Sequence, residues 1–199
     1  MCLGVHSRVP ATSTRSWCHH LTSVIILIDS YAEDQTMIRP VKITDAPAFC
    51  AIYNHYVEHT IITFAEKPVS INDMENVIRE VTAAYPWLVY EQTGTVIGYA
   101  YAARWKSRAS YRHCAETTIY LAQESRGRGI GGQLYGALIE KCRPLPIHTL
   151  IGCIALPNPA SVALHEQLKF EKVAHFREVG RKFNQWIDVG YWELILEMA

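Results

Sequence analysis

The segment that most constrains the fold of this chain is the glycine- and arginine-rich stretch at residues 124–132, ESRGRGIGG. It follows an apolar, strand-like run and leads directly into a helix-like one. Four glycines allow a sharp turn and a close approach to an anion, while Arg126 and Arg128 supply positive charge. The following helix presents unpaired N–H groups at its start. The stretch therefore predicts a seat for a pyrophosphate-bearing cofactor; the alternative is a glycine-rich turn that only caps a helix.

The size and charge of the chain exclude several classes of protein. With 199 residues, 49% of them hydrophobic, it can bury one core and is expected to form a single main domain. Its formal net charge is zero, so neither a nucleic-acid partner nor a membrane surface is expected. The longest apolar run of the N-terminal third, residues 24–28, is far short of the roughly 18 residues that span a bilayer.

The N-terminal part and the cysteines indicate the domain boundary and the compartment. Residues 1–36 show no sustained periodicity, whereas a strand-like alternation begins at Met37. We therefore expect a poorly structured extension over residues 1–36 and a folded domain over residues 37–199. The six cysteines include no C-x-x-C pair, which argues against a zinc ribbon or a disulfide framework and favours a reducing, cytoplasmic location. A secretory signal is not expected, because the apolar run is too brief.

Two helices are expected after a first strand at residues 37–42. Thr44 is the expected N-cap of the first helix, with Pro47 in its first turn. Ser70 and Asp73 form a capping arrangement for the second helix. Apolar residues then recur at spacings of three and four, and this stripe is expected to face the core. The residues of the stripe are Met74, Val77, Ile78 and Val81.

A strand-rich half follows. Residues 87–90 and 96–101, separated by a turn at residues 92–94, are typical of a hairpin. The further strands expected are residues 114–121, 149–155, 173–179 and 189–196. The further helices expected are residues 130–142 and 160–168. This order indicates a mixed α/β layer without internal repeats.

The order of elements, β-α-α-β-β-β-α-β-α-β-β, resembles that of the GCN5-related N-acetyltransferases (the GNAT family). The motif Arg126-x-x-Gly129-x-Gly131 lies between the fourth strand and the third helix, where that family binds the pyrophosphate of acetyl-CoA. Asn158 and residues 165–170 lie where the family has its second cofactor motif. The resemblance implies an α/β (α+β) fold, with a central mixed, mostly antiparallel sheet of about seven strands flanked by four helices.

From Met37 almost to the C-terminus, the chain is similar to the phosphinothricin and methionine-sulfoximine acetyltransferase branch of that family. The stretches that carry this similarity are residues 54–56, 85–89, 105–108, 115–120, 134–135, 156–158 and 188–192. Lys169 departs from the pattern, because the family usually has a glycine before Phe170. His165 stands where many acetyltransferases of the wider fold have a tyrosine, and the branch itself has histidine there.

The resemblance implies acetyl-CoA as co-substrate, no metal, and a homodimer. Trp186, Tyr191 and Trp192 either serve the dimer contact or fill the core. The backbone of the fourth strand is expected to pair with the pantetheine arm, and a main-chain N–H to polarise the thioester carbonyl. The residues expected to contact the cofactor are Ile119, Leu121, Arg126, Gly127, Arg128, Gly129, Ile130, Gly131, Gly132, Asn158 and Ser161.

Two side chains are the expected proton carriers. An amine attacks a thioester only when it is unprotonated, so a base must take its proton. Glu116 is the first candidate, because partial burial in its strand would raise its pKa; the alternative is a carboxylate paired with Arg108 or Arg112. His165 is the second candidate, as base, as relay or as donor to the departing thiolate. The alternative is a helix histidine that faces solvent or bonds to the backbone.

The loop before Glu116 is basic and suits an anionic acceptor. A guanidinium grips a carboxylate or phosphinate with two hydrogen bonds, and aromatic side chains would wall a compact pocket. The residues expected to bind the acceptor are Phe64, Trp105, Lys106, Arg108 and Tyr111. The resemblance implies detoxifying acetylation of the α-amine of a small glutamate-like amino acid: phosphinothricin, methionine sulfoximine or methionine sulfone. The alternative is an ordinary solvated basic loop.

Three other functions are considered. Residues 55–59 spell H-x-x-E-H, a pattern of inverted zinc peptidases, but the β-branched residues 60–63 are expected to end the helix and no third ligand follows. A non-catalytic acyl-CoA-binding module would keep the glycine loop, although Glu116 and His165 argue against it. A polyamine, an aminoglycoside or a protein N-terminus is the alternative acceptor. No cysteine has a nucleophile context, so direct transfer without an acyl-enzyme is expected.

Overall fold

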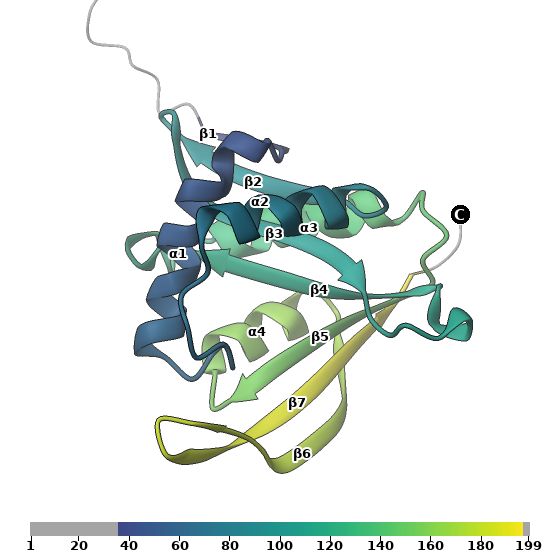
Figure 1. Ribbon diagram of the computed structural model, residues 1–199. Coiled ribbons are helices and arrows are strands. Elements are labelled where there is room, and N and C mark those ends of the chain that lie inside the picture. Colours follow the sequence, from purple (N-terminus) through teal and green to yellow (C-terminus); the bar gives the residue numbers. More distant parts are fainter. Residues whose placement is uncertain (1–35, 197–199) are drawn as a thin grey trace, which may run out of the picture. The chain divides into compact units, whose positions relative to one another are not determined.

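The computed structural model of the chain describes residues 36–196 (Figure 1). Its centre is a seven-stranded sheet in the order β1-β2-β3-β4-β5-β7-β6. The strands are β1 (Thr36–Pro40), β2 (Trp87–Gln92), β3 (Thr95–Arg104), β4 (Cys114–Leu121), β5 (Thr149–Leu156), β6 (Glu171–Lys182) and β7 (Gln185–Ile195). The mixed, mostly antiparallel sheet predicted from the sequence is confirmed. The extension expected over residues 1–36 lies outside the described residues except for Thr36, the first residue of β1.

Helices cover both faces of this sheet. Within residues 36–196 they are α1 (Ala46–His59), α2 (Ile71–Thr82), α3 (Ile130–Cys142) and α4 (Pro159–Gln167). Successive side chains of a strand point to opposite faces. Trp87 and Val89 of β2 accordingly pack with α1 and α2, while Leu88 and Tyr90 pack in the cluster that contains α3. None of the helices in this described part is both long and apolar enough to cross a membrane.

The pairing of β4 with β5 is the feature that shapes the site. Every other neighbouring pair in the sheet is antiparallel, whereas β4 and β5 run parallel and pair only from Cys114–Thr149 to Thr117–Gly152. Both strands continue beyond this point, and Figure 1 shows them spreading apart. We call the opening between them the fork. Among residues 36–196, no strand pairs with the backbone of β4 after Thr117 on its β5 side.

The start of α1 differs from the sequence prediction. Thr44 was expected to be the N-cap, but it lies inside a short 3-10 turn, Ile43–Asp45, and the N-cap is Asp45. The Asp45 carboxylate accepts hydrogen bonds from Arg39 (2.8 Å) and from the Lys42 N–H (2.7 Å). Burial raises the pKa of Asp45, but these bonds outweigh it, so that the pKa is lowered. Arg39, six residues earlier in the chain, thus holds the Asp45 carboxylate at the start of α1.

Helix α2 begins where the sequence predicts, but its core-facing stripe contains fewer residues than predicted. Ser70 is the N-cap, and its hydroxyl accepts from the Asp73 N–H at 3.1 Å. Met74 and Ile78 are buried as expected. Val77 was wrongly expected in the core, because it is 39% exposed. It lies about 100° around the helix from Ile78, at the edge of the face that meets the sheet.

Candidate active site

The glycine-rich loop joins β4 to α3 through two residues with left-handed backbone angles. Gly127 has φ +73° and Gly129 has φ +77°, a region that residues with a Cβ avoid. Gly129 is the N-cap of α3, and no side chain caps this helix. The N–H groups of the first turn of α3 therefore have no capping side chain from the N-cap residue, and such N–H groups are suited to an anion.

A cleft of about 310 Å³ lies beside this loop, between β4, α3 and α4. We call it the glycine-loop cleft. Its lining residues are Tyr56, Ile62, Ile119, Tyr120, Leu121, Arg126, Gly127, Gly129, Gly131, Gly132, Asn158, Ala160, Ser161, Ala163, Leu164 and Gln167. Every residue predicted to contact the cofactor is among them except Arg128 and Ile130. Arg128 is exposed and bonds to Gln92 (3.4 Å), and the Ile130 side chain is buried in the core.

Sequence reasoning missed part of this cleft. Tyr56 of α1 closes one side, and its hydroxyl donates to the Leu121 carbonyl at 2.6 Å. No local signal marks this contact, because 65 residues separate the two partners. The α4 side was detectable: Ala160, Ala163, Leu164 and Gln167 follow the spacing of one helix face.

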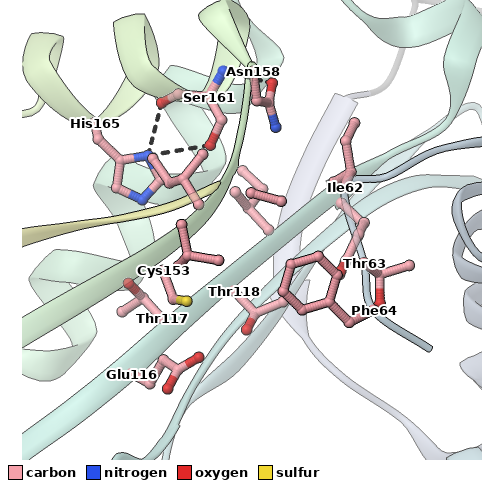
Figure 2. Close-up of a pocket in the computed structure, with 15 residues that line it drawn as sticks. Ile62, Thr63, Phe64, Glu116, Thr117, Thr118, Cys153, Asn158, Ser161 and His165 are labelled. Atoms are coloured by element: carbon pink, nitrogen blue, oxygen red, sulfur yellow. Dashed lines mark hydrogen bonds between the residues drawn. The ribbon is translucent and has the colours of Figure 1, made fainter. Parts of the chain in front are cut away.

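A second, smaller cavity of about 210 Å³ adjoins the cleft at the fork. We call it the fork pocket. Its lining residues are Ile62, Thr63, Phe64, Glu116, Thr117, Thr118, Ile119, Tyr120, Cys153, Ile154, Ala155, Asn158, Ser161, His165 and Val189. Figure 2 shows Glu116, Cys153 and Phe64 around one space, with His165 beside Ser161 of α4. The structure thus brings Glu116, His165 and Phe64 to one pocket.

Glu116 is a half-buried carboxylate at the base of the fork. Burial raises its pKa, and the charge of Lys106 opposes this rise. Within residues 36–196 it forms no salt bridge, so the predicted alternative of a pair with Arg108 or Arg112 does not occur. A carboxylate in this setting holds a proton more readily than one in water and serves better as a base near neutral pH.

His165 is 4% exposed and has a partner at each ring nitrogen. Nδ1 lies 2.8 Å from the Ser161 carbonyl, and Nε2 lies 3.0 Å from the Tyr135 hydroxyl. Burial lowers the pKa of His165, while the Ser161 carbonyl opposes this. The predicted alternative of a solvent-facing histidine is wrong, whereas a bond to the backbone is present. Neutral His165 that donates from Nδ1 must accept at Nε2.

The contacts of His165 continue into the sheet. The Tyr135 hydroxyl also bonds to the Thr117 hydroxyl, which donates to the Ile151 carbonyl at 3.1 Å. The Thr117 hydroxyl gives its one proton to the Ile151 carbonyl, so Tyr135 must donate to Thr117. For the contact between Tyr135 and His165 to be a hydrogen bond as well, the Tyr135 oxygen must accept from Nε2. That arrangement needs a doubly protonated ring, which burial disfavours. With a neutral His165 ring, the contacts that link His165, Tyr135 and Thr117 therefore share one proton fewer than they need for all of them to be hydrogen bonds.

The basic loop lies near the fork pocket rather than in its wall. Lys106 sits over the Trp105 ring (5.1 Å), and Trp105 meets Tyr111 edge to face (5.2 Å). The Arg104 guanidinium donates to the Lys106 carbonyl at 2.9 Å and holds the loop. None of these residues, nor Arg108, lines the pocket. The charge of Lys106 nevertheless opposes the rise in the pKa of Glu116.

The H-x-x-E-H segment does not form a metal site. His55 and His59 stack on one another (4.7 Å), and Nδ1 of His59 lies 3.0 Å from the His55 carbonyl. Helix α1 ends at His59, as the β-branched residues after it predicted. No three His, Cys, Asp or Glu side chains gather to hold a metal anywhere in residues 36–196.

Comparison with known proteins agrees with this geometry. The chain matches the family described as "Acetyltransferase (GNAT) domain" over residues 38–190. It is 35% identical over 161 residues to phosphinothricin N-acetyltransferase of Streptomyces viridochromogenes, which covers 81% of this chain and 88% of the relative. It is 34% identical over 162 residues to the L-methionine sulfoximine/L-methionine sulfone acetyltransferase of Pseudomonas paraeruginosa, covering 80% and 94%. An acetyltransferase of Salmonella typhimurium, solved with its cofactor acetyl-CoA, matches the fold with TM-score 0.81 and 31% identity, covering 83% and 96%.

An uncapped helix start behind a glycine loop, a forked sheet and a buried carboxylate at the fork together define an acyl-transfer enzyme. The chain belongs to the GNAT family of acetyltransferases. The predicted family, fold class and enzyme class, an acetyl-CoA-dependent N-acetyltransferase, are thereby confirmed. The glycine-loop cleft fits this co-substrate, because it offers uncapped N–H groups and an arginine next to an open strand edge.

The raised pKa of Glu116 predicts a stability cost at neutral pH. When the folded pKa exceeds the unfolded one, the folded state binds more protons, so stability falls as pH rises through that window. Glu116→Gln removes the buried charge and is expected to raise the thermal midpoint at pH 7.5 by about 2 °C or more. The gain should vanish near pH 4, where the wild-type carboxyl is protonated. Differential scanning calorimetry at both pH values measures this.

Glu80→Gln is the matched control, because Glu80 is an exposed glutamate on α2. It should leave the midpoint unchanged at both pH values. A Glu116→Gln protein that is less stable than wild type at pH 7.5 would contradict the assignment of Glu116 as a carboxylate destabilised by burial.

Proposed function

We propose that this enzyme transfers the acetyl group of acetyl-CoA to the α-amine of a small glutamate-like amino acid such as phosphinothricin, methionine sulfoximine or methionine sulfone. The observation that carries this proposal is the position of Glu116. Its half-buried carboxylate has a raised pKa and lies in a small pocket that adjoins the glycine-loop cleft. A proton acceptor is thus available where the two substrates meet.

The glycine-loop cleft supplies the seat for the co-substrate. Bound acetyl-CoA brings an acetyl group activated as a thioester. The N–H groups at the start of α3, together with Arg126, would hold its diphosphate. The backbone of β4 from Ile119 to Leu121 has no strand partner on the fork side, which suits pairing with the amides of the pantetheine arm.

In this scheme Glu116 accepts a proton from the acceptor's ammonium group, directly or through one water. The freed amine attacks the thioester carbonyl, and the new N–C bond forms as the C–S bond breaks. The attacking nitrogen gives its second proton to the departing sulfur, so coenzyme A leaves as the thiol. A main-chain N–H of β4 would stabilise the negative charge that develops on the carbonyl oxygen. Positioned acid–base help of this kind contributes about 10² to 10⁴ in rate.

His165 is better suited to positioning than to taking the amine's proton. Its Nε2 faces Tyr135 and its Nδ1 faces Ser161, so no free lone pair points into the fork pocket. The bond to the Ser161 carbonyl fixes the first turn of α4, which carries Asn158 and Ser161 into both cavities. These contacts favour Glu116 as the base and leave His165 to hold the cleft wall.

The acceptor class rests on size and charge. The fork pocket is small, at about 210 Å³, and the positive charge of Lys106 acts on Glu116 in its wall. Cations at the mouth of a compact pocket suit a small acid better than a polyamine or an aminoglycoside. Acetylation would remove the charge of the amine and so detoxify an acid that mimics glutamate. The cytoplasmic location stays a prediction from the sequence.

A thiol-release assay with acetyl-CoA tests the acceptor class. The panel is phosphinothricin, methionine sulfoximine, methionine sulfone, spermidine and a tripeptide. We expect turnover with at least one of the three acids and none with spermidine. Turnover with only spermidine or the tripeptide would reject the acceptor class, and no turnover with any acceptor would favour a non-catalytic acyl-CoA-binding module.

Glu116→Gln in the same assay tests the base. We expect kcat to fall at least about 100-fold while the Kd for acetyl-CoA stays unchanged. The exposed Glu80→Gln variant again serves as control and should turn over like wild type. Wild-type kcat in Glu116→Gln would remove Glu116 from the mechanism.

A homodimer is the proposed assembly. Strand β6 is an edge strand, and the β6–β7 hairpin with its turn exposes four apolar side chains, each about half exposed or more: Val173, Phe176, Phe183 and Trp186. Of the three predicted aromatic residues, Trp192 is buried in the core and Tyr191 is partly buried, so Trp186 is the one that suits a contact. Sedimentation equilibrium should show a dimer that Trp186→Glu weakens. A monomeric wild-type protein at micromolar concentrations would contradict this.

A further inference from the structure

One wall of the fork pocket comes from the connection between α1 and α2, and this wall is held from two sides. Thr63 is 8% exposed, and its hydroxyl hydrogen-bonds the Tyr53 hydroxyl of α1 at 2.8 Å. On the other side, Nζ of Lys182 in β6 donates to the Thr63 carbonyl at 2.8 Å. Lys182 is only 4% exposed, and a buried ammonium needs such a partner. The β6–β7 hairpin therefore anchors the pocket wall.

The next residue, Phe64, packs its ring against a glycine of the same hairpin. A Cβ added to Gly180 would lie 2.4 Å from Cζ and 2.7 Å from Cε2 of Phe64, far inside the contact distance of carbon atoms. Phe64 also lines the fork pocket, whereas Gly180 does not. The Phe64 ring thus lies between the hairpin and the cavity. It fits there because Gly180 has no side chain.

An irregularity in β6 brings Gly180 to this position. The register of β6 with β7 shifts between Phe176 and Gly180, and Glu178 has φ +55°. Asp188 of β7 holds the shifted segment: one carboxylate oxygen accepts from the Glu178 N–H (2.9 Å) and the other lies 2.7 Å from Nε2 of His175. Bulges of this kind bend a strand and re-aim its residues next to active sites.

We propose that Gly180 is a specificity-determining residue: by leaving room for the Phe64 ring, it sets the depth of the fork pocket and so the length of acceptor that fits. Any side chain at position 180 moves the ring toward the cavity. Phe64 is 43% exposed and can shift without disrupting the core, so the effect falls on the pocket and not on folding. This inference rests on the proposed function of the same pocket.

The test compares methionine sulfone with its homologue one methylene shorter, S-methylcysteine sulfone. Gly180→Ala is expected to lower kcat/KM for the longer acid at least about 10-fold more than for the shorter one, since one methylene in a pocket is worth about 10- to 200-fold. The KM for acetyl-CoA should not change. In a Phe64→Ala background the same substitution should change this ratio little, because the coupled partner is gone.

Gly136→Ala is the control, because a Cβ there meets only Leu168, at an ordinary 4.0 Å. It should leave the ratio between the two acids as in wild type. An unchanged ratio in Gly180→Ala, or an equal change in both Phe64 backgrounds, would overturn the inference. If wild type acetylates neither acid, the proposed acceptor class fails, and a crystal structure of Gly180→Ala decides the inference separately. A Phe64 ring shifted toward the cavity supports it, and a ring left in place overturns it.

Discussion

The site depends on one constraint, which is that β4 and β5 stay paired only as far as Thr117 and Gly152. Beyond that point the edge of β4 is open, so its backbone groups can meet a ligand instead of a strand. Glu116 lies at the base of this opening, and the glycine loop that starts α3 follows the far end of the same strand. One strand thereby connects a seat for an anion with a proton acceptor.

The two faces of β4 are buried against different helices at the fork. Glu116 shares its strand face with Tyr120, which packs with α1 and α2, whereas Thr117 points to the opposite face and bonds to Tyr135 of α3. His165 belongs to that second face. Burial favours the neutral form of both titratable groups, raising the pKa of Glu116 and lowering that of His165. Both groups therefore lie in surroundings less polar than water, which strengthens any electrostatic interaction made inside the fork.

Local signals were sufficient for most of the fold. The strand at 114–121 and the helix at 130–142 coincide with β4 and α3, because apolar periodicity and the glycine loop fix both ends. The misses come from tertiary contacts. Asp45 and not Thr44 is the N-cap of α1, and its carboxylate is held by Arg39 of β1. The contacts of Tyr56 with Leu121 and of Gly180 with Phe64 join parts of the chain that share no local pattern. Such contacts exist only once the sheet has formed.

The most direct test of this account is a crystal structure of the protein with acetyl-CoA bound. We predict that diphosphate oxygens lie about 2.7–3.2 Å from amide nitrogens in the first turn of α3. The pantetheine arm should pair with β4 beyond Thr117, and the acetyl carbon should face Glu116 across the fork. A diphosphate bound elsewhere, or an acetyl group on the side of the sheet away from Glu116, would contradict the account.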